Sequence, residues 1–457
     1  MQQVNHREDD VLTDTGAQRV TISTIMGLAV PALGVLLTTP IFVLLDTAIV
    51  GRLGGIALAA LAAGSTIYSM FSAQLTFLSY GTTARSARLY GAGDRRGAIT
   101  EGVQATWIAL FVGTGLCMVI FFNAEQLCAW MSTQPDIAQR AAGWLKITAF
   151  AIPLVLIDMA GNGWLRGIQN TRLPLLFTLA GVIPAAVLIP IFVHKWGLYG
   201  SAWATLLATA ITALCFLGCL IHHHQGSWIP RVSIITHQLV LARDLIIRSL
   251  SFQVAFLCAA AVLGRYGATA LAAHHILLQL WNFIALFLDS LAIAAQALVG
   301  QALGAQSRER ARSVAQRVLG FSTFLACILA LCCALGHTFI ARIFTHDEAV
   351  LRVVAHSWWQ LIVMTIVGGV VFALDGVLLG AGDAAFLRSI SLASVLGGFL
   401  PGIALAAILG TGLIGVWWAL MAFVFIRFIA VVWRFISMKW AHIDDVTAMT
   451  EKSTRGI

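Results

Sequence analysis

Four aspartates lie inside long apolar stretches of this 457-residue sequence: Asp46, Asp158, Asp289 and Asp375. A charged side chain at the centre of a bilayer costs about 2.5 kcal/mol or more, so an acid at that depth is a functional-site hypothesis by default. Desolvation favours the neutral form of a carboxylate, which can then take up and release a proton or hold a cation. The chemistry predicted by these residues is ion binding within a membrane.

The composition places the acids in a membrane protein. Apolar residues make up 59% of the chain, charged residues only 11%, and the mean hydropathy is +0.89, whereas soluble domains are about 25% charged. A membrane-spanning helix needs about 20 apolar residues, and long uninterrupted runs argue against a β-barrel. The fold class predicted is therefore an all-α polytopic membrane protein with twelve transmembrane helices. The apolar runs cover residues 22–50, 58–80, 100–122, 141–165, 173–193, 197–221, 241–263, 271–303, 314–344, 353–379, 387–409 and 413–436.

The distribution of Lys and Arg predicts the orientation. With the first tail placed inside, the inner segments, Arg248 counted among them, carry twenty of the 28 basic residues and the outer segments seven. Arg427 lies within the last span, and we expect its side chain to extend towards the inner membrane surface. Basic residues concentrate in cytoplasmic loops of membrane proteins. We therefore expect a multi-pass protein of the plasma (cytoplasmic) membrane with both termini in the cytoplasm.

The chain is a tandem repeat with an offset of 213 residues. The sequence GRLGGIALAA from Gly51 recurs as GRYGATALAA from Gly264, and GAGDRRGA from Gly91 corresponds to GAQSRERA from Gly304. An even number of spans per copy makes the two halves parallel, an arrangement found in alternating-access transporters. We expect two six-helix halves at residues 22–221 and 241–436, joined by a cytoplasmic linker at residues 222–240. The tails cover residues 1–21 and 437–457.

The repeat does not extend to the acids. Applying the offset pairs Asp46 with Ala259, Asp289 with Thr76, and Asp375 with Asn162. The two halves therefore share a scaffold while their chemistry has diverged. We take Asp46, Asp289, Asp375 and Asn162 as candidate substrate- or cation-binding residues.

Asp158 is left open, because it lies near Arg166 and either pairs with it or takes part in function. The first span also contains Pro31 and Pro40. Each proline removes a backbone donor and frees a carbonyl. These two positions are candidate hinges, and a static kink is the alternative.

Several stretches together resemble the multidrug and toxic compound extrusion (MATE) family: LLDTAIVGRLG in the first span, GWLRGIQNTRLPL after the fourth, and FALDGVLLGAGD in the tenth. The LDG triplet, with LDSLAIAAQALVGQALGA in span eight, points to the DinF-like branch. The resemblance implies an antiporter that exports organic or xenobiotic compounds, as in multidrug efflux, in exchange for protons or sodium ions. It also implies that Asp46, Asp375 and Asp289 are the acids of spans one, ten and eight.

The sequence departs from this family at Ile189, where many members carry an acid in span five. Without that partner, Asp46 is a lone acid, which suits a proton better than a sodium ion. Asp289 and Asp375 could instead supply part of an oxygen set for one ion. The coupling ion, H⁺ or Na⁺, and the substrate remain open.

Three other functions were weighed. A lipid-linked saccharide flippase should line its cavity with basic residues, whereas the mid-span residues read as acidic or neutral. An embedded enzyme would need a motif such as HExxH, and no such motif occurs. A channel is disfavoured by the repeat with unequal acids.

The remaining expectations concern ligands and partners. We expect no cofactor and no metal, because His222, His223 and His224 read as a solvated loop. The eight cysteines read as small apolar residues within or beside the spans. We expect a monomer in the lipid bilayer that binds a small organic substrate and no nucleic acid.

The topology is testable at the linker. A cysteine introduced at Ser227 should resist a membrane-impermeant thiol reagent applied to intact cells, because the linker should face the cytoplasm. A cysteine at Ser132, in a segment expected outside, is the positive control. Efficient labelling at position 227 in intact cells would contradict this topology.

Overall fold

The computed structural model describes residues 21–132 and 134–442, and these residues are helical apart from short turns. The predicted all-helical fold is confirmed. The first half contains α1 (Ile22–Gly51), α2 (Gly55–Gln74), α3 (Phe77–Gly91), α4 (Arg95–Met131), α5 (Pro135–Ala149), α6 (Ala151–Gly167), α7 (Arg172–Trp196) and α8 (Leu198–His223). The second contains α9 (Val232–Gly264), α10 (Ala268–Gly304), α11 (Arg308–Leu335), α12 (His337–Phe344), α13 (Glu348–Gly380), α14 (Ala384–Ser394), the π-helical η2 (Val395–Phe399), α15 (Leu400–Leu409) and α16 (Gly412–Ile436).

Several spans are interrupted. Eleven segments of the described chain are long and apolar enough to cross a membrane, and the pair α5 and α6, bent by 44°, brings the number to twelve. The span α14 to α15 contains the π-helical turn η2 at Gly397 and Gly398, just before Pro401. Such π-bulges are common at functional sites.

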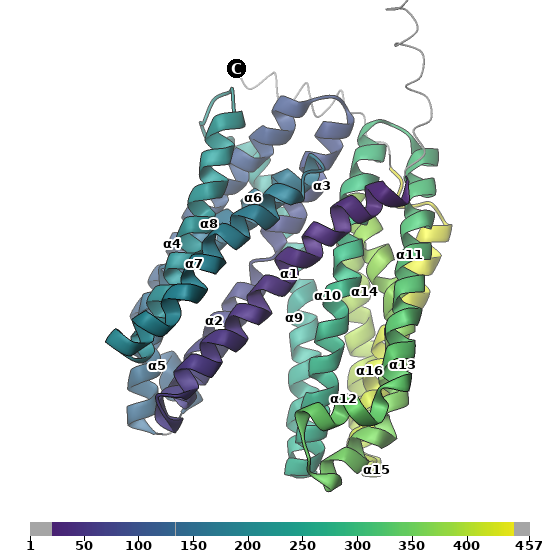
Figure 1. Cartoon of the computed structure of the whole chain (residues 1–457). Coiled ribbons are helices and arrows are strands. Elements are labelled where there is room, and N and C mark those ends of the chain that lie inside the picture. The colour runs from purple at the N-terminus through teal and green to yellow at the C-terminus, as the bar shows by residue number, and fades with distance from the viewer. Residues whose placement is uncertain (1–20, 133, 443–457) are drawn as a thin grey trace, which may run out of the picture.

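The helices form two bundles. Figure 1 shows α4 to α8 on one side and α9 to α16 on the other, with α1 crossing obliquely between them. The connection between α8 and α9 lies at what we call the linker end of the molecule. The turns after α3 and α10 lie at this same end, because α3 leads directly into α4, whose first turns hold the linker.

The duplication is visible in the backbone. Four pairs of residues with positive φ are separated by the repeat offset of 213 residues. Their φ angles are 110° and 104°, 83° and 58°, 63° and 76°, and 59° and 65°. These pairs are Gly54 and Gly267, Gly93 and Gln306, Gln169 and Gly382, and Gly197 and Gly410. Positive-φ residues lie in the turns between helices, so the two halves place their turns at equivalent positions in the repeat.

The two bundles meet where α3 and α10 end. A Cβ atom on Gly91 would lie 2.0 Å from the carbonyl oxygen of Gln301, and one on Gly304 would lie 2.0 Å from that of Arg88. The offset of 213 relates Gly91 to Gly304 and Arg88 to Gln301, so this is one contact made twice. Only glycine allows the backbones to approach so closely.

Polar side chains fasten the same contact. Gln296 of α10 donates a 2.7 Å hydrogen bond from Nε2 to the carbonyl oxygen of Tyr80 on α3. Gln169 Nε2 lies 2.5 Å from Gln301 Oε1, and Arg88 donates to the carbonyl oxygen of Ala381. The linker end is therefore closed by backbone contact and by hydrogen bonds between the halves.

The linker is shorter and more firmly held than the sequence indicated. Helix α8 continues to His223 and α9 begins at Val232, so much of the expected linker over residues 222–240 is helical. The side chain of Gln104 on α4 donates to Ile229 O (3.2 Å) and accepts from Arg231 N (2.7 Å). Helix α9 begins nine residues before the apolar run predicted from residue 241, and Gln238 in this first part is buried against Glu101 of α4 at 2.8 Å.

Both candidate hinge prolines lie inside a continuous α1. Because Pro31 has no N–H, the carbonyl of Gly27 loses its helical partner. Thr171, at the start of α7, donates from Oγ1 to that carbonyl at 3.3 Å. The residue that precedes α7 thus compensates for the proline in α1. Motion at Pro31 or Pro40 stays a prediction.

The glycine contact can be tested by adding a side chain. Gly91→Val or Gly304→Val should prevent closure of the linker end, because the new Cβ would overlap a carbonyl oxygen. A reporter cysteine at Ala84, which is 3% exposed, should then react with a small thiol reagent several-fold faster. Gly320→Val is the matched control, since nothing lies within 4 Å of its added Cβ. Unchanged reactivity in both interface variants would contradict this account of closure.

Candidate functional site

Asp46 on α1 is held by two other helices of its own half. Its side chain is buried, and Ser201 of α8 donates from Oγ to Oδ2 at 2.7 Å. Trp144 of α5 donates from Nε1 to that same Ser201 Oγ at 3.2 Å, which fixes the direction of the hydroxyl. Asp46 Oδ1 is buried and has no hydrogen-bond partner among the described residues. One oxygen is therefore positioned, and the other is available to a proton or a cation.

The span-five position at which the resemblance would place a second acid holds an apolar residue here. Ile189 is fully buried in a small cluster with Phe42, Ala185, Ala204 and Ala208. These side chains supply no oxygen to an ion near Asp46. Among the described residues, the hydrogen-bonding surroundings of Asp46 therefore supply one hydroxyl and no second carboxylate.

Of the two alternatives left open for Asp158, the structure does not show the pairing with Arg166. Eight residues of α-helix separate them by about 12 Å along the axis, and Arg166 instead lies 3.4 Å from Ser79 Oγ through Nη1. Asn162 donates from Nδ2 to the backbone oxygen of Asp158 at 2.9 Å. The side-chain oxygens Asp158 Oδ1 and Asn162 Oδ1 are buried without partners among the described residues. Asn162 remains a candidate ligand, and the role of Asp158 remains open.

Asp289 on α10 joins the two halves. The hydroxyl of Tyr80 on α3 donates to Asp289 Oδ2 at 3.2 Å. Arg166, Arg248 and Asp375 all lie within electrostatic range of this carboxylate. The Tyr80–Asp289 hydrogen bond therefore belongs to the contact that closes the linker end.

Asp375 on α13 is paired with two arginines. Its Oδ2 accepts from Arg248 Nη2 of α9 at 2.6 Å and from Arg427 Nη2 of α16 at 2.5 Å. The side chains of Arg248, Arg427 and Asp375 are only 15%, 7% and 8% exposed. A joint cation site made by Asp289 and Asp375 is thus disfavoured, because Asp375 already faces two positive charges.

Both arginines correct the sequence interpretation. Arg427 was expected to extend towards the membrane surface from the last span, but it is buried against Asp375. Arg248 was counted with the inner loops, but α9 begins sixteen residues earlier, at Val232. Its distance from the helix start is about 24 Å. The sequence signal that could have predicted this pairing was Arg427 itself, because a charge inside a span needs a buried partner.

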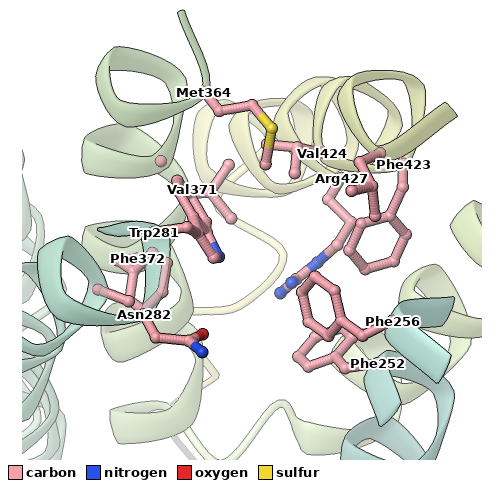
Figure 2. A pocket seen from close by; sticks show the side chains of 13 residues that line it. Phe252, Phe256, Trp281, Asn282, Met364, Val371, Phe372, Phe423, Val424 and Arg427 are labelled. Atoms are coloured by element: carbon pink, nitrogen blue, oxygen red, sulfur yellow. The ribbon is translucent and has the colours of Figure 1, made fainter. Parts of the chain in front are cut away.

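A cavity of about 200 Å³ opens beside Arg427 in the second half. Figure 2 shows the guanidinium of Arg427 directed into the space between Phe252 and Phe256 on one side and Trp281 and Asn282 on the other. The walls come from α9, α10, α13 and α16. The lining residues are Phe252, Phe256, Trp281, Asn282, Ala285, Met364, Gly368, Val371, Phe372, Leu420, Phe423, Val424 and Arg427.

The structure thus groups the candidates unequally. Asp289 and Asp375 share Arg248 as an electrostatic neighbour, while the hydrogen-bond partners of Asp46 come from its own half. Within the described part of the chain, no three His, Cys, Asp or Glu residues are placed to hold a metal ion. The arrangement can bind ions and small organic molecules.

Comparison with known proteins identifies the family. The MatE family matches residues 31–191 and 245–404, one match in each half. The chain belongs to the MatE family. Its curated relatives include Protein DETOXIFICATION 44, chloroplastic, of Arabidopsis thaliana, which is 28% identical over 94% of this chain and 85% of the relative. They also include DNA damage-inducible protein F of Escherichia coli K12, 27% identical over 89% and 91%.

The fold of this MatE-family chain is shared with solved transporters. It matches the outward-facing conformation of a multidrug resistance MATE family transporter of the MOP superfamily with a TM-score of 0.83 and 19% identity, covering 92% of this chain and 96% of that one. The resemblance to the MATE family and its DinF-like branch is thereby confirmed. The protein is a multi-pass membrane transporter.

The ion pair in the second half predicts an order of stabilities. Asp375→Asn should destabilise the protein by about 3–5 kcal/mol, because it leaves two buried guanidinium groups without their counter-ion. Arg427→Met should destabilise less, because Asp375 keeps Arg248. Thermal unfolding in detergent measures both, with Asp136→Asn at the exposed start of α5 as the control. A larger effect from Arg427→Met than from Asp375→Asn would contradict this charge balance.

Proposed function

We propose that the protein is a secondary active antiporter that exports small organic compounds in exchange for an inward-moving ion. The observation that carries the proposal is the twofold glycine contact between α3 and α10, which closes one end of the molecule through equivalent residues of the two halves. Two rigid halves joined in this way can rock about the contact between two states. A site that opens towards the space between them then faces each side of the membrane in turn.

The coupling ion that best fits Asp46 is a proton. Sodium requires several oxygen ligands, while the described surroundings offer this carboxylate one hydroxyl and an apolar cluster around Ile189. A proton needs only one oxygen, and Asp46 Oδ1 has no other partner there. Burial favours the neutral form and contact with water the charged form. Exposure to alternate sides would therefore load and release the proton.

Asp289 would couple ion binding in the second half to the opening and closing of the linker end. When the halves separate at the linker end, the hydrogen bond from Tyr80 must break, which leaves the carboxylate to bind an ion or water instead. Asn162 is included because its Oδ1 is buried and unpartnered. In this proposal Asp375 acts through its two arginines and does not bind the coupling ion.

The flippase alternative is not adopted, although one reason given against it was wrong. The mid-span residues include Arg248 and Arg427, so the cavity is not free of basic groups. Membership of the MatE family favours export of organic compounds. A cavity of about 200 Å³ is also small for a lipid-linked saccharide.

The orientation and cellular setting are part of the proposal. Placing the Arg-rich loops in the cytoplasm makes the linker end the inner end, so this structure is the outward-facing state. A relative from Escherichia coli supports the cytoplasmic membrane as the location. We expect a monomer, because each chain contains both halves.

The proton assignment is tested at Asp46. Asp46→Asn should reduce export driven by a pH gradient in everted vesicles by about tenfold or more, while folded protein remains in the membrane. Ethidium and an aromatic carboxylate serve as test compounds, with pH and sodium gradients imposed separately. Asp136→Asn is the matched control. Normal export by Asp46→Asn, or export that follows only the sodium gradient, would overturn the assignment.

A further inference from the structure

We propose that the cavity beside Arg427 is the substrate site and that it selects organic anions, in particular small aromatic carboxylates. The inference rests on the proposed transport function and specifies its substrate class. It depends on how three charged side chains and the aromatic wall are arranged within the second half.

The walls fit an aromatic ring. Phe252, Phe256, Trp281, Phe372 and Phe423 supply flat apolar faces, and Met364 adds a flexible one. A cavity of about 150 Å³ lined by apolar side chains is large enough to bind benzene. A cavity of about 200 Å³ therefore has room for one ring and one small polar group.

The charges do not balance. Arg248 and Arg427 share the single carboxylate of Asp375, which leaves a net charge of +1 on three largely buried side chains. Including the neighbouring Arg166 and ionised Asp289 adds one charge of each sign and leaves the same +1. An uncompensated charge away from water is costly, so an anion in the cavity would complete the pairing.

The arginines also have unused donors. Nε of Arg427 and Nε of Arg248 are buried without a hydrogen-bond partner among the described residues. The side chain of Arg427 is more than nine-tenths buried and lines the cavity. A guanidinium presents its donors as a planar fork that matches the two oxygens of a carboxylate. The fork of Arg427 is thus the recognition element.

The ring of Phe252 helps to hold both forks in place. The Cζ atoms of Arg427 and Arg248 lie 4.6 Å and 5.4 Å from its centroid, and Arg427 also lies 5.8 Å from that of Phe423. Such contacts favour a cation already present. An organic cation entering the cavity would be repelled by the charge of Arg427, and this repulsion is stronger than in water because the dielectric constant there is lower.

Three probes of nearly the same shape separate charge from size. Benzoate, benzamide and benzamidinium carry charges of −1, 0 and +1 on the same ring. Binding to the purified full-length protein can be followed by tryptophan fluorescence, since Trp281 lines the cavity. We expect benzoate to bind at least tenfold more tightly than benzamide, and benzamidinium to bind most weakly.

Variants then change the charge of the site in both directions. Arg427→Met should weaken benzoate binding by tenfold or more, and Arg427→Lys should weaken it less. Asp375→Asn removes the competing carboxylate and should strengthen benzoate binding several-fold, a gain that general damage to the fold would not produce. Arg434→Met is the matched control, because Arg434 lies on the same helix and pairs with Asp383 at 2.7 Å, away from the cavity lining.

The outcomes distinguish this inference from the proposed function. Binding is measured without any gradient, so a failure of coupled export in vesicles would leave the charge preference intact. Tighter binding of benzamidinium than of benzoate would overturn the inference, as would unaltered benzoate binding in Arg427→Met. If Asp375→Asn does not fold, the ranking of the three probes on wild type, Arg427→Lys and Arg427→Met decides the question.

Discussion

The structure depends on the close approach of two helix ends that are copies of each other. Gly91 and Gly304 let α3 and α10 pass with their backbones in contact, and the offset of 213 residues makes this a self-complementary contact within one chain. The polar fasteners around it, from Gln296 to Tyr80 and from Arg88 to Ala381, would not reach one another without it. The position of Asp289 beside Tyr80 follows from the same approach.

Duplication has kept the backbone and changed the polar side chains. The left-handed turns recur almost residue for residue, since each is needed to end a span and begin the next. Asp46 and Ser201 have no acidic counterpart in the second half, where Arg248, Arg427 and Asp375 form a triad instead. One half is built around a neutralisable acid, and the other around fixed charge. The proposed division of tasks between the two similar bundles rests on this asymmetry.

The sequence predicted the spans, the repeat and the four acids because each leaves a local signal. Hydropathy reports the apolar runs, and an acid inside such a run stands out. The partners of those acids were harder to predict, because pairing depends on helix rotation and on distant segments. Arg248 was counted with the inner segments because it lies near the start of the predicted run at residue 241, whereas α9 begins at Val232 and places it well inside the helix. The sequence left the pairing of Asp158 with Arg166 open, because proximity in sequence does not determine proximity on a helix.

The connection between the halves has a mechanical consequence. On α9, Gln238 is bonded to Glu101 of the first half, whereas Asp244, six residues later, is bonded to Arg388 of the second half at 2.6 Å. Six residues of helix span only about 9 Å. The first turns of α9 are therefore bonded to the first half, while the helix from Asp244 onward is bonded to the second half. Any rocking of one bundle against the other must therefore strain the segment of α9 between Gln238 and Asp244. Arg248 lies one turn beyond Asp244.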